Sequence, residues 1–202
     1  MKDEEFKNIL NLSTHRIKNL LASAKALIAI FRKSKNQKQT LSKIEGKINL
    51  INFGIDNLFE SIYLTESTME FFYEFFDFKE ILIKQREKSR QIVVEADSFE
   101  TMGDREKLEK AIGIFINYMK LHSRLEDKIQ IKFIKKENKG KLIIKSVNNK
   151  NFNLKLDNDL TIELYIARKI IELHGGKYKE QKNKVIRLSI DIPKKAKRLN
   201  LG

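Results

Sequence analysis

Two apolar repeats in the first third of the chain constrain its fold more than any other feature. The first recurs every seven residues and is widened by neighbouring positions: Leu10, Ile17, Ala24, Phe31, Leu20, Leu27, Leu21 and Ile28. The second alternates steps of three and four without a break: Leu41, Ile44, Ile48, Ile51, Ile55, Leu58 and Ile62. Such spacing lines one face of an α-helix, so each series predicts a long amphipathic helix.

A short polar connector, KSKNQKQT at 33–40, separates the two series and predicts an antiparallel helical hairpin of residues 8–35 and 40–70. A lone hairpin leaves its narrow apolar seam in water. We therefore expect a homodimer in which two copies form a four-helix bundle. Packing of the hairpin against the C-terminal part of the same chain is the alternative.

The rest of the chain mixes helices and strands. Helical patterns cover 78–90, 103–123 and 160–176, and strand patterns cover 91–96, 128–136, 141–147 and 184–193. The strands on either side of ENKG form a predicted hairpin, and the glycine pair at 175–176 suits a left-handed helix end. We expect an α+β architecture with a mixed sheet and helices on one face. The predicted domains are residues 1–74 and 75–202.

Charge and composition restrict the function. The net charge is +14, but 27 acidic residues are interspersed with 41 basic ones, and the one dense basic run is PKKAKR at 193–198. This spread does not favour nucleic-acid binding, and an acidic protein partner suits the charge equally well. The chain has no cysteine, no signal-like start and no apolar stretch able to span a membrane. We expect a soluble, cytoplasmic protein.

The first repeat also locates a histidine. With Leu10 and Ile17 in the seam, His15 falls on the opposite, exposed face, together with the small residues Ala22 and Ala29. Another protein could approach such a face closely. A lone exposed histidine is usually incidental, so a role for His15 depends on its neighbours.

Three segments resemble the two-component sensor histidine kinases, in the order and spacing of that family. HRIKNLLASAKALI (15–28) resembles the phosphoacceptor helix, and MGDREKLEKAIGIFINYMKLHS (102–123) resembles the segment that contains the N box. LYIARKIIELHGGKY (164–178) resembles the stretch that follows the second glycine box. The resemblance implies a dimerisation and phosphoacceptor hairpin over 1–74 and a domain similar to the kinase ATPase domain over 75–202.

The nucleotide-binding motifs of that family are missing. Residues 141–160, where an Asp-x-Gly-x-Gly box is expected, contain no glycine, and Thr161 and Glu163 occupy positions of the second glycine box. Asn117 aligns with an N-box asparagine, but Gly113 occupies the position of the other one. Without these glycines the backbone cannot close around phosphates. We expect a degenerate ATPase domain without a cofactor of its own.

This combination is similar to the dimeric histidine phosphotransferases of phosphorelays, which move phosphoryl groups between aspartates of response-regulator receiver domains. The resemblance implies that His15 is the phosphoacceptor, with Arg16, Lys18 and Asn19 in support. It also implies that the receiver brings Mg²⁺ and docks across the neighbouring helix surface: Ala22, Ser23, Lys25, Ala26 and Ala29. Arg16, Lys18 and Asn19 equally fit a solvated polar face.

Three other functions remain open at this stage. One is a divergent histidine kinase that autophosphorylates with ATP at His15. The second is a non-catalytic dimeric adaptor for two-component proteins, and nucleic-acid binding is the third and least favoured. The remaining histidines, His122 and His174, have no supporting motif, and His174 is interpreted as a helix-end residue favourable to the helix dipole.

Overall fold

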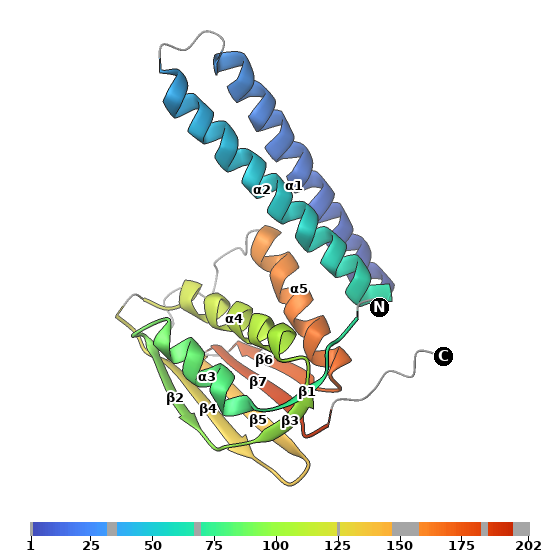
Figure 1. The fold of residues 1–202 in the computed structure, drawn as a ribbon, viewed down its shortest axis with the longest axis vertical. Coiled ribbons are helices and arrows are strands. Elements are labelled where there is room, and N and C mark those ends of the chain that lie inside the picture. Colours follow the sequence, from blue (N-terminus) through green and yellow to red (C-terminus); the bar gives the residue numbers. More distant parts are fainter. Residues whose placement is uncertain are drawn as a thin grey trace. The chain divides into compact units, whose positions relative to one another are not determined.

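The computed structural model describes residues 2–31, 36–66, 70–124, 126–146, 158–182 and 186–195 (Figure 1). The chain divides into two compact units. The first comprises residues 1–69 with 156–165, and the second comprises residues 70–155 with 166–202. No helix in the described ranges is both long enough and apolar enough to cross a membrane.

The predicted hairpin is present. Helices α1 (Lys2–Phe31) and α2 (Gln37–Glu66) run side by side in opposite directions (Figure 1). Ala24, Ile44 and Ile51 are buried between them, in agreement with the apolar series. Other members of the series stay in contact with solvent in this single chain, and Leu41 and Ile48 are 47% and 46% exposed. The hairpin therefore keeps an uncovered apolar surface.

A five-stranded mixed sheet forms the centre of the second unit, in the order β2-β4-β5-β7-β6. The β2–β4 pair is parallel and the other pairs are antiparallel, including the predicted hairpin of β4 and β5. The strand bounds are Ile92–Ala96 for β2, Ile129–Lys135 for β4, Lys139–Ser146 for β5, Lys177–Lys182 for β6 and Ile186–Pro193 for β7.

Helices cover one face of this sheet, as predicted (Figure 1). They are α3 (Phe78–Glu87), α4 (Arg105–Leu121) and α5 (Asn158–Leu173). Asp77 and Asp104 begin α3 and α4 by accepting hydrogen bonds from backbone N–H groups of the first turn, which are otherwise unsatisfied. The core between helices and sheet consists of aliphatic and aromatic side chains, among them Leu82, Ile112, Phe115, Ile144, Ile170 and Leu188.

Helix α5 ends at a glycine pair, as the sequence predicts. Gly175 has φ of 78°, and its N–H donates to the carbonyl oxygen of Glu172. The N–H of Gly176 donates to the carbonyl oxygen of Ile171. These two hydrogen bonds satisfy carbonyl groups in the last turn of the helix. The left-handed conformation of Gly175 favours glycine at that position. The turn redirects the chain into β6.

Three strands are absent from the sequence prediction. Glu74–Asp77 (β1) and Glu100–Gly103 (β3) pair as a separate antiparallel ribbon, and β6 forms the edge of the main sheet. The first two are only four residues long, so a period of two is hard to recognise in them. Strand β6, KYKEQK, is almost entirely polar, which is common at sheet edges.

Candidate functional site

His15 lies in the middle of α1 with its side chain exposed to solvent. Ala22 and Ala29, seven and fourteen residues further along the same helix, are exposed as well. The buried residues Ser13 and Ala24 lie on the opposite side, toward α2. The helical period therefore places the imidazole away from the seam, with small side chains along its own face of α1.

Asn19 contacts the imidazole one helical turn later. Its Nδ2 lies 3.1 Å from Nδ1 of His15, and both side chains are exposed. In this orientation Nδ2 donates to Nδ1, and the proton of a neutral imidazole is on Nε2. Rotation of the amide by half a turn brings Oδ1 to the same place, where it accepts a hydrogen bond from Nδ1–H and leaves the Nε2 lone pair available. The contact thus holds Nδ1 and leaves Nε2 as the ring nitrogen directed away from Asn19.

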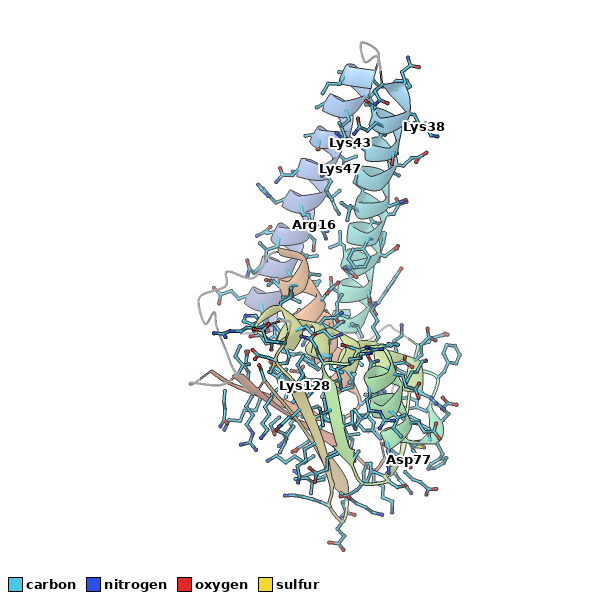
Figure 2. The ribbon with its side chains drawn as sticks, turned by 90° about the vertical axis from the view of Figure 1, so that its left-hand side faces the viewer. Arg16, Lys38, Lys43, Lys47, Asp77 and Lys128 are labelled. Carbon is cyan, nitrogen blue, oxygen red and sulfur yellow. The ribbon has the colours of Figure 1, made fainter. Side chains whose placement is uncertain are left out.

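The two basic neighbours of His15 point in different directions. Lys18 is exposed, whereas Arg16 is half-buried. A guanidinium nitrogen of Arg16 is 3.9 Å from where a Cβ of Gly54 would lie, so this side chain extends toward α2 (Figure 2). The Cγ1 atom of Ile17 lies 3.5 Å from the same Cβ position, so the missing side chain of Gly54 leaves space for Ile17 as well. Of these two cations, Lys18 is the one oriented to solvent.

The predicted docking residues lie on the two turns that follow. Ala22, Lys25, Ala26 and Ala29 are exposed, and Ser23 is half-buried. Three of these five residues are alanines, so few side-chain atoms project from this part of the helix. Lys25 carries its single charge. Its shape suits an approaching protein.

The space between α4 and β6 is filled by large side chains. The rings of Phe115 and Tyr178 stack with centroids 5.1 Å apart and an interplanar angle of 10°. Next to them, the Tyr118 hydroxyl donates to Oε1 of Glu180 at 2.5 Å. Burial and the Glu180 carboxylate raise the pKa of Tyr118, so its hydroxyl stays protonated. Sequence reasoning missed this cluster, because nothing in the polar sequence of β6 indicates which residues face the helices.

The residues expected at the nucleotide motifs are placed differently. Asn117 is exposed, and together with Gly113 it lines a groove of about 580 Å³ between α3 and α4. The next residue, Tyr118, is the one directed toward β6. Thr161 and Glu163 lie within helix α5 rather than in a loop. Residues 147–157, which fall in the region where the resemblance places the first glycine box, lie outside the described residues.

His174 is not the simple helix-end residue that the sequence analysis describes. Its side chain is buried, its Nε2 accepts a hydrogen bond from the backbone N–H of Asp104 at 3.0 Å, and its Nδ1 is 2.7 Å from the carbonyl oxygen of Ile170. The rings of Phe71 and Tyr73 lie against it, at centroid distances of 5.2 and 5.9 Å. A donor on one side and an acceptor on the other select the neutral Nδ1–H form.

This arrangement fixes the start of the second unit. The Asp104 carboxylate accepts a hydrogen bond from the backbone N–H of Phe72 at 3.0 Å, and its backbone N–H is held by His174. His122 has a related but simpler environment. It is buried, with Nδ1 2.9 Å from the carbonyl oxygen of Tyr118. Both histidines are structural in this fold, in contrast to the exposed His15.

Acidification should destabilise the protein through His174. Burial lowers the pKa of His174 below its ordinary value, against the opposing effects of the Ile170 carbonyl and the Asp104 carboxylate. Tyr73, the other titratable group against the ring, stays neutral because burial and Asp104 raise its pKa. Since the unfolded chain binds the proton more readily, this contribution is complete above about pH 6.5 and is lost as the pH falls below that value.

We expect thermal unfolding to show this loss. Between pH 7 and pH 5, the stability of the unmodified chain should decrease by up to about 1.4 kcal/mol per pH unit more than that of His174→Asn. Asparagine retains a donor and an acceptor but does not titrate. A matched control is His122→Asn, which removes the other buried histidine. Identical pH profiles for the unmodified chain and His174→Asn would contradict the assignment.

Comparison with known proteins identifies the fold. No protein-family model matches the chain, and no curated protein matches its sequence. Among solved structures, the histidine kinase AdeS of Acinetobacter baumannii has a TM-score of 0.71 at 16% identity. The match covers 89% of this chain and 98% of that one. The histidine kinase ThkA in complex with the response regulator TrrA has a TM-score of 0.63 at 20% identity.

The ThkA match covers 90% of this chain and 59% of the ThkA chain. A structure of the ThkA catalytic domain alone also matches, with a TM-score of 0.52 at 20% identity. This match covers 63% of the present chain and 97% of the ThkA domain. The longer matches thus include the helical hairpin as well as the sheet unit. At these identities the comparisons establish the architecture and leave the chemistry to be argued from the residues.

Proposed function

We propose that this chain, whose fold is that of the sensor histidine kinases, is a histidine phosphotransferase that shuttles phosphoryl groups between receiver-domain aspartates through His15. The observation that carries the proposal is the exposed imidazole on the outward face of the hairpin, with Nδ1 held by Asn19 at 3.1 Å. The low surface of Ala22, Ala26 and Ala29 beside it leaves room for a receiver domain. We further propose that the active form is a homodimer.

The reaction requires little equipment from this chain. Nε2 of neutral His15 attacks the phosphorus of a phosphoaspartate in line, the bond from phosphorus to the carboxylate oxygen breaks, and the aspartate leaves as a carboxylate. The ring keeps its Nδ1 proton and becomes a cation, whose Nδ1–H the rotated Asn19 amide accepts. A second receiver carboxylate reverses the step and releases neutral imidazole. The receiver supplies Mg²⁺, so His15 mainly needs correct placement.

Lys18 and Asn19 have different roles in this proposal. Lys18 is exposed one turn before the docking surface and can attract an acidic receiver pocket. Arg16 extends toward α2, so its contribution to the phosphoryl charge is indirect. Asn19 contacts the reacting ring itself. We therefore assign orientation of the nucleophile to Asn19 and attraction of the partner to Lys18.

The filled space between α4 and β6 supports a reaction without ATP. The stacked rings of Phe115 and Tyr178 occupy volume beside the sheet, and the Glu180 carboxylate places negative charge there. A nucleotide bound between α4 and β6 would have to displace the rings and approach a like charge. The continuous helix at Thr161 and Glu163 also leaves no glycine loop to bind phosphates.

Nucleotide should therefore leave the thermal stability unchanged. We expect no increase in melting temperature with millimolar ATP or ADP and Mg²⁺, measured by differential scanning calorimetry. A ligand present at one hundred times its Kd would stabilise the native state by about 2.7 kcal/mol, a shift that is easily detected. A histidine kinase with intact glycine boxes serves as the positive control. A nucleotide-dependent shift followed by labelling of His15 would instead identify an autophosphorylating kinase.

The central test is transfer from phosphorylated receiver domains of the same genome. Each receiver, labelled with radioactive phosphate on its aspartate, is mixed with this chain without nucleotide, and label is followed by gel. The proposal expects acid-labile, base-stable label on this chain, which then passes to a second receiver. A receiver that binds stoichiometrically but never transfers label would favour the adaptor function.

A further inference from the structure

The face of the main sheet that carries no helices has an unusual composition. The strand registers align its outward side chains in rows across the sheet, because paired residues point to the same side of a sheet. The first row is Val93, Gln130, Lys145, Arg187 and Gln181. The second is Glu95, Lys132, Ile143, Ser189 and Lys179. The third is Ile134, Lys141, Asp191 and Lys177, and Lys139 follows beside Pro193.

We call these rows the open sheet face, and they concentrate positive charge. They contain seven cations, Lys132, Lys139, Lys141, Lys145, Lys177, Lys179 and Arg187, and two carboxylates, Glu95 and Asp191. The whole chain has 41 basic and 27 acidic residues, a far more even balance. Basic residues that are dispersed in the sequence therefore meet on one surface of the fold.

Both carboxylates of this face are already engaged. Glu95 accepts a hydrogen bond from Lys132 at 2.7 Å, and Asp191 accepts one from Lys139 at 2.7 Å. The two ion pairs neutralise two of the seven cations, so five remain without a compensating carboxylate on the face. Lys145 and Arg187 are direct neighbours across β5 and β7, and both are exposed. Two adjacent cations repel each other in the absence of an anion.

The centre of the face is hollow. A depression of about 370 Å³ lies across β2, β4, β5 and β7, and its lining includes Glu95, Lys132, Lys145 and Arg187. A hollow with cations along it accepts a convex, negatively charged partner. Five strands at a spacing of about 4.8 Å make the face roughly 19 Å wide. A nucleic-acid duplex presents one phosphate charge per about 1.7 Å of axis, which places several phosphates within that width.

We propose that the open sheet face binds the phosphate backbone of double-stranded nucleic acid, without sequence preference. Protein interfaces are depleted in lysine and rich in aromatic residues, whereas the rows given above contain six lysines and no aromatic residue. Single-strand binding relies on aromatic stacking, which these rows do not provide. A planar lipid surface does not follow the central hollow. This activity is separate from phosphoryl transfer at His15.

Fluorescence anisotropy with a labelled mixed-sequence DNA duplex of about 24 base pairs tests the proposal. About five phosphate contacts predict a slope of roughly −4.5 in log K against log salt, which is a several-hundredfold loss of affinity between 50 and 200 mM salt. The double variant Lys145→Glu and Arg187→Glu should bind at least tenfold more weakly at 50 mM salt, with a slope shallower by about 2. Circular dichroism verifies that the variant is folded.

A matched control separates this face from the general basic charge of the chain. Lys38→Glu with Lys43→Glu makes the same charge change on exposed positions of α2 (Figure 2) and should keep most of the affinity. Equal losses in the two double variants would overturn the proposal, as would absence of duplex binding at 50 mM salt. Tighter binding to a single strand of equal length, or to phosphatidylserine vesicles, would also overturn it. The His15→Gln variant, in which phosphoryl transfer is lost, should bind the duplex as tightly as the unmodified chain.

Discussion

His15→Gln should abolish phosphoryl transfer from every receiver domain that labels the unmodified chain. Glutamine cannot form a phosphohistidine, so the loss should be complete rather than partial. Because His15 is exposed, the substitution should change the free energy of unfolding by no more than about 0.5 kcal/mol, or roughly 2 °C in melting temperature. Gel-based transfer assays and calorimetry on the same preparation measure both quantities.

Variants of Asn19 refine this test. Asn19→Asp supplies a fixed acceptor for Nδ1–H and should retain transfer, whereas Asn19→Leu removes the contact and should slow transfer by about tenfold, the effect of one hydrogen bond. A His122→Gln variant controls for the loss of a histidine in the second unit. If the His15→Gln variant is still labelled, His15 is not the phosphoacceptor, although the chain still transfers phosphoryl groups. If the unmodified chain is never labelled, the adaptor function is favoured.

The second large effect concerns assembly. Light scattering should give the mass of a dimer for the unmodified chain, because the apolar residues Leu21, Ile28, Leu41 and Ile48 are each at least 44% exposed in the single hairpin. Ile48→Asp would place a carboxylate in the dimer seam. The cost of burying it, several kcal/mol, should weaken dimerisation by at least a thousandfold and give monomers at micromolar concentration.

Ser42→Asp is the matched control for this substitution. Ser42 is exposed on the same helix, outside the apolar series and about 120° around the helix axis from Ile48, so the variant adds a charge away from the seam. It should remain dimeric. A monomeric mass for the unmodified chain would reject the homodimer, and it would direct attention to an unrelated partner for the apolar surface of α1 and α2.

Local periodicity was sufficient to predict most of the fold. The apolar series at 10–31 and 41–62 predicted two helices and an outward His15, because a helix repeats every 3.6 residues whatever it packs against. The strands β2, β4, β5 and β7 were predicted, the last three of them from alternation. The short ribbon of β1 and β3 and the polar β6 were not, because their stability comes from pairing rather than from their own sequences.

The sequence by itself determined the helical hairpin, the exposure of His15 and the absence of glycine boxes, since each depends on residues that are close in the chain. Only the tertiary structure decided which distant side chains meet. Phe115 stacks on Tyr178, the backbone N–H of Asp104 donates to Nε2 of His174, and Lys145 lies beside Arg187. The physical reason is that sheet register and helix packing set these contacts. A shift of one residue in the register of a strand would exchange its side chains between the filled, helix-covered face and the basic, open face.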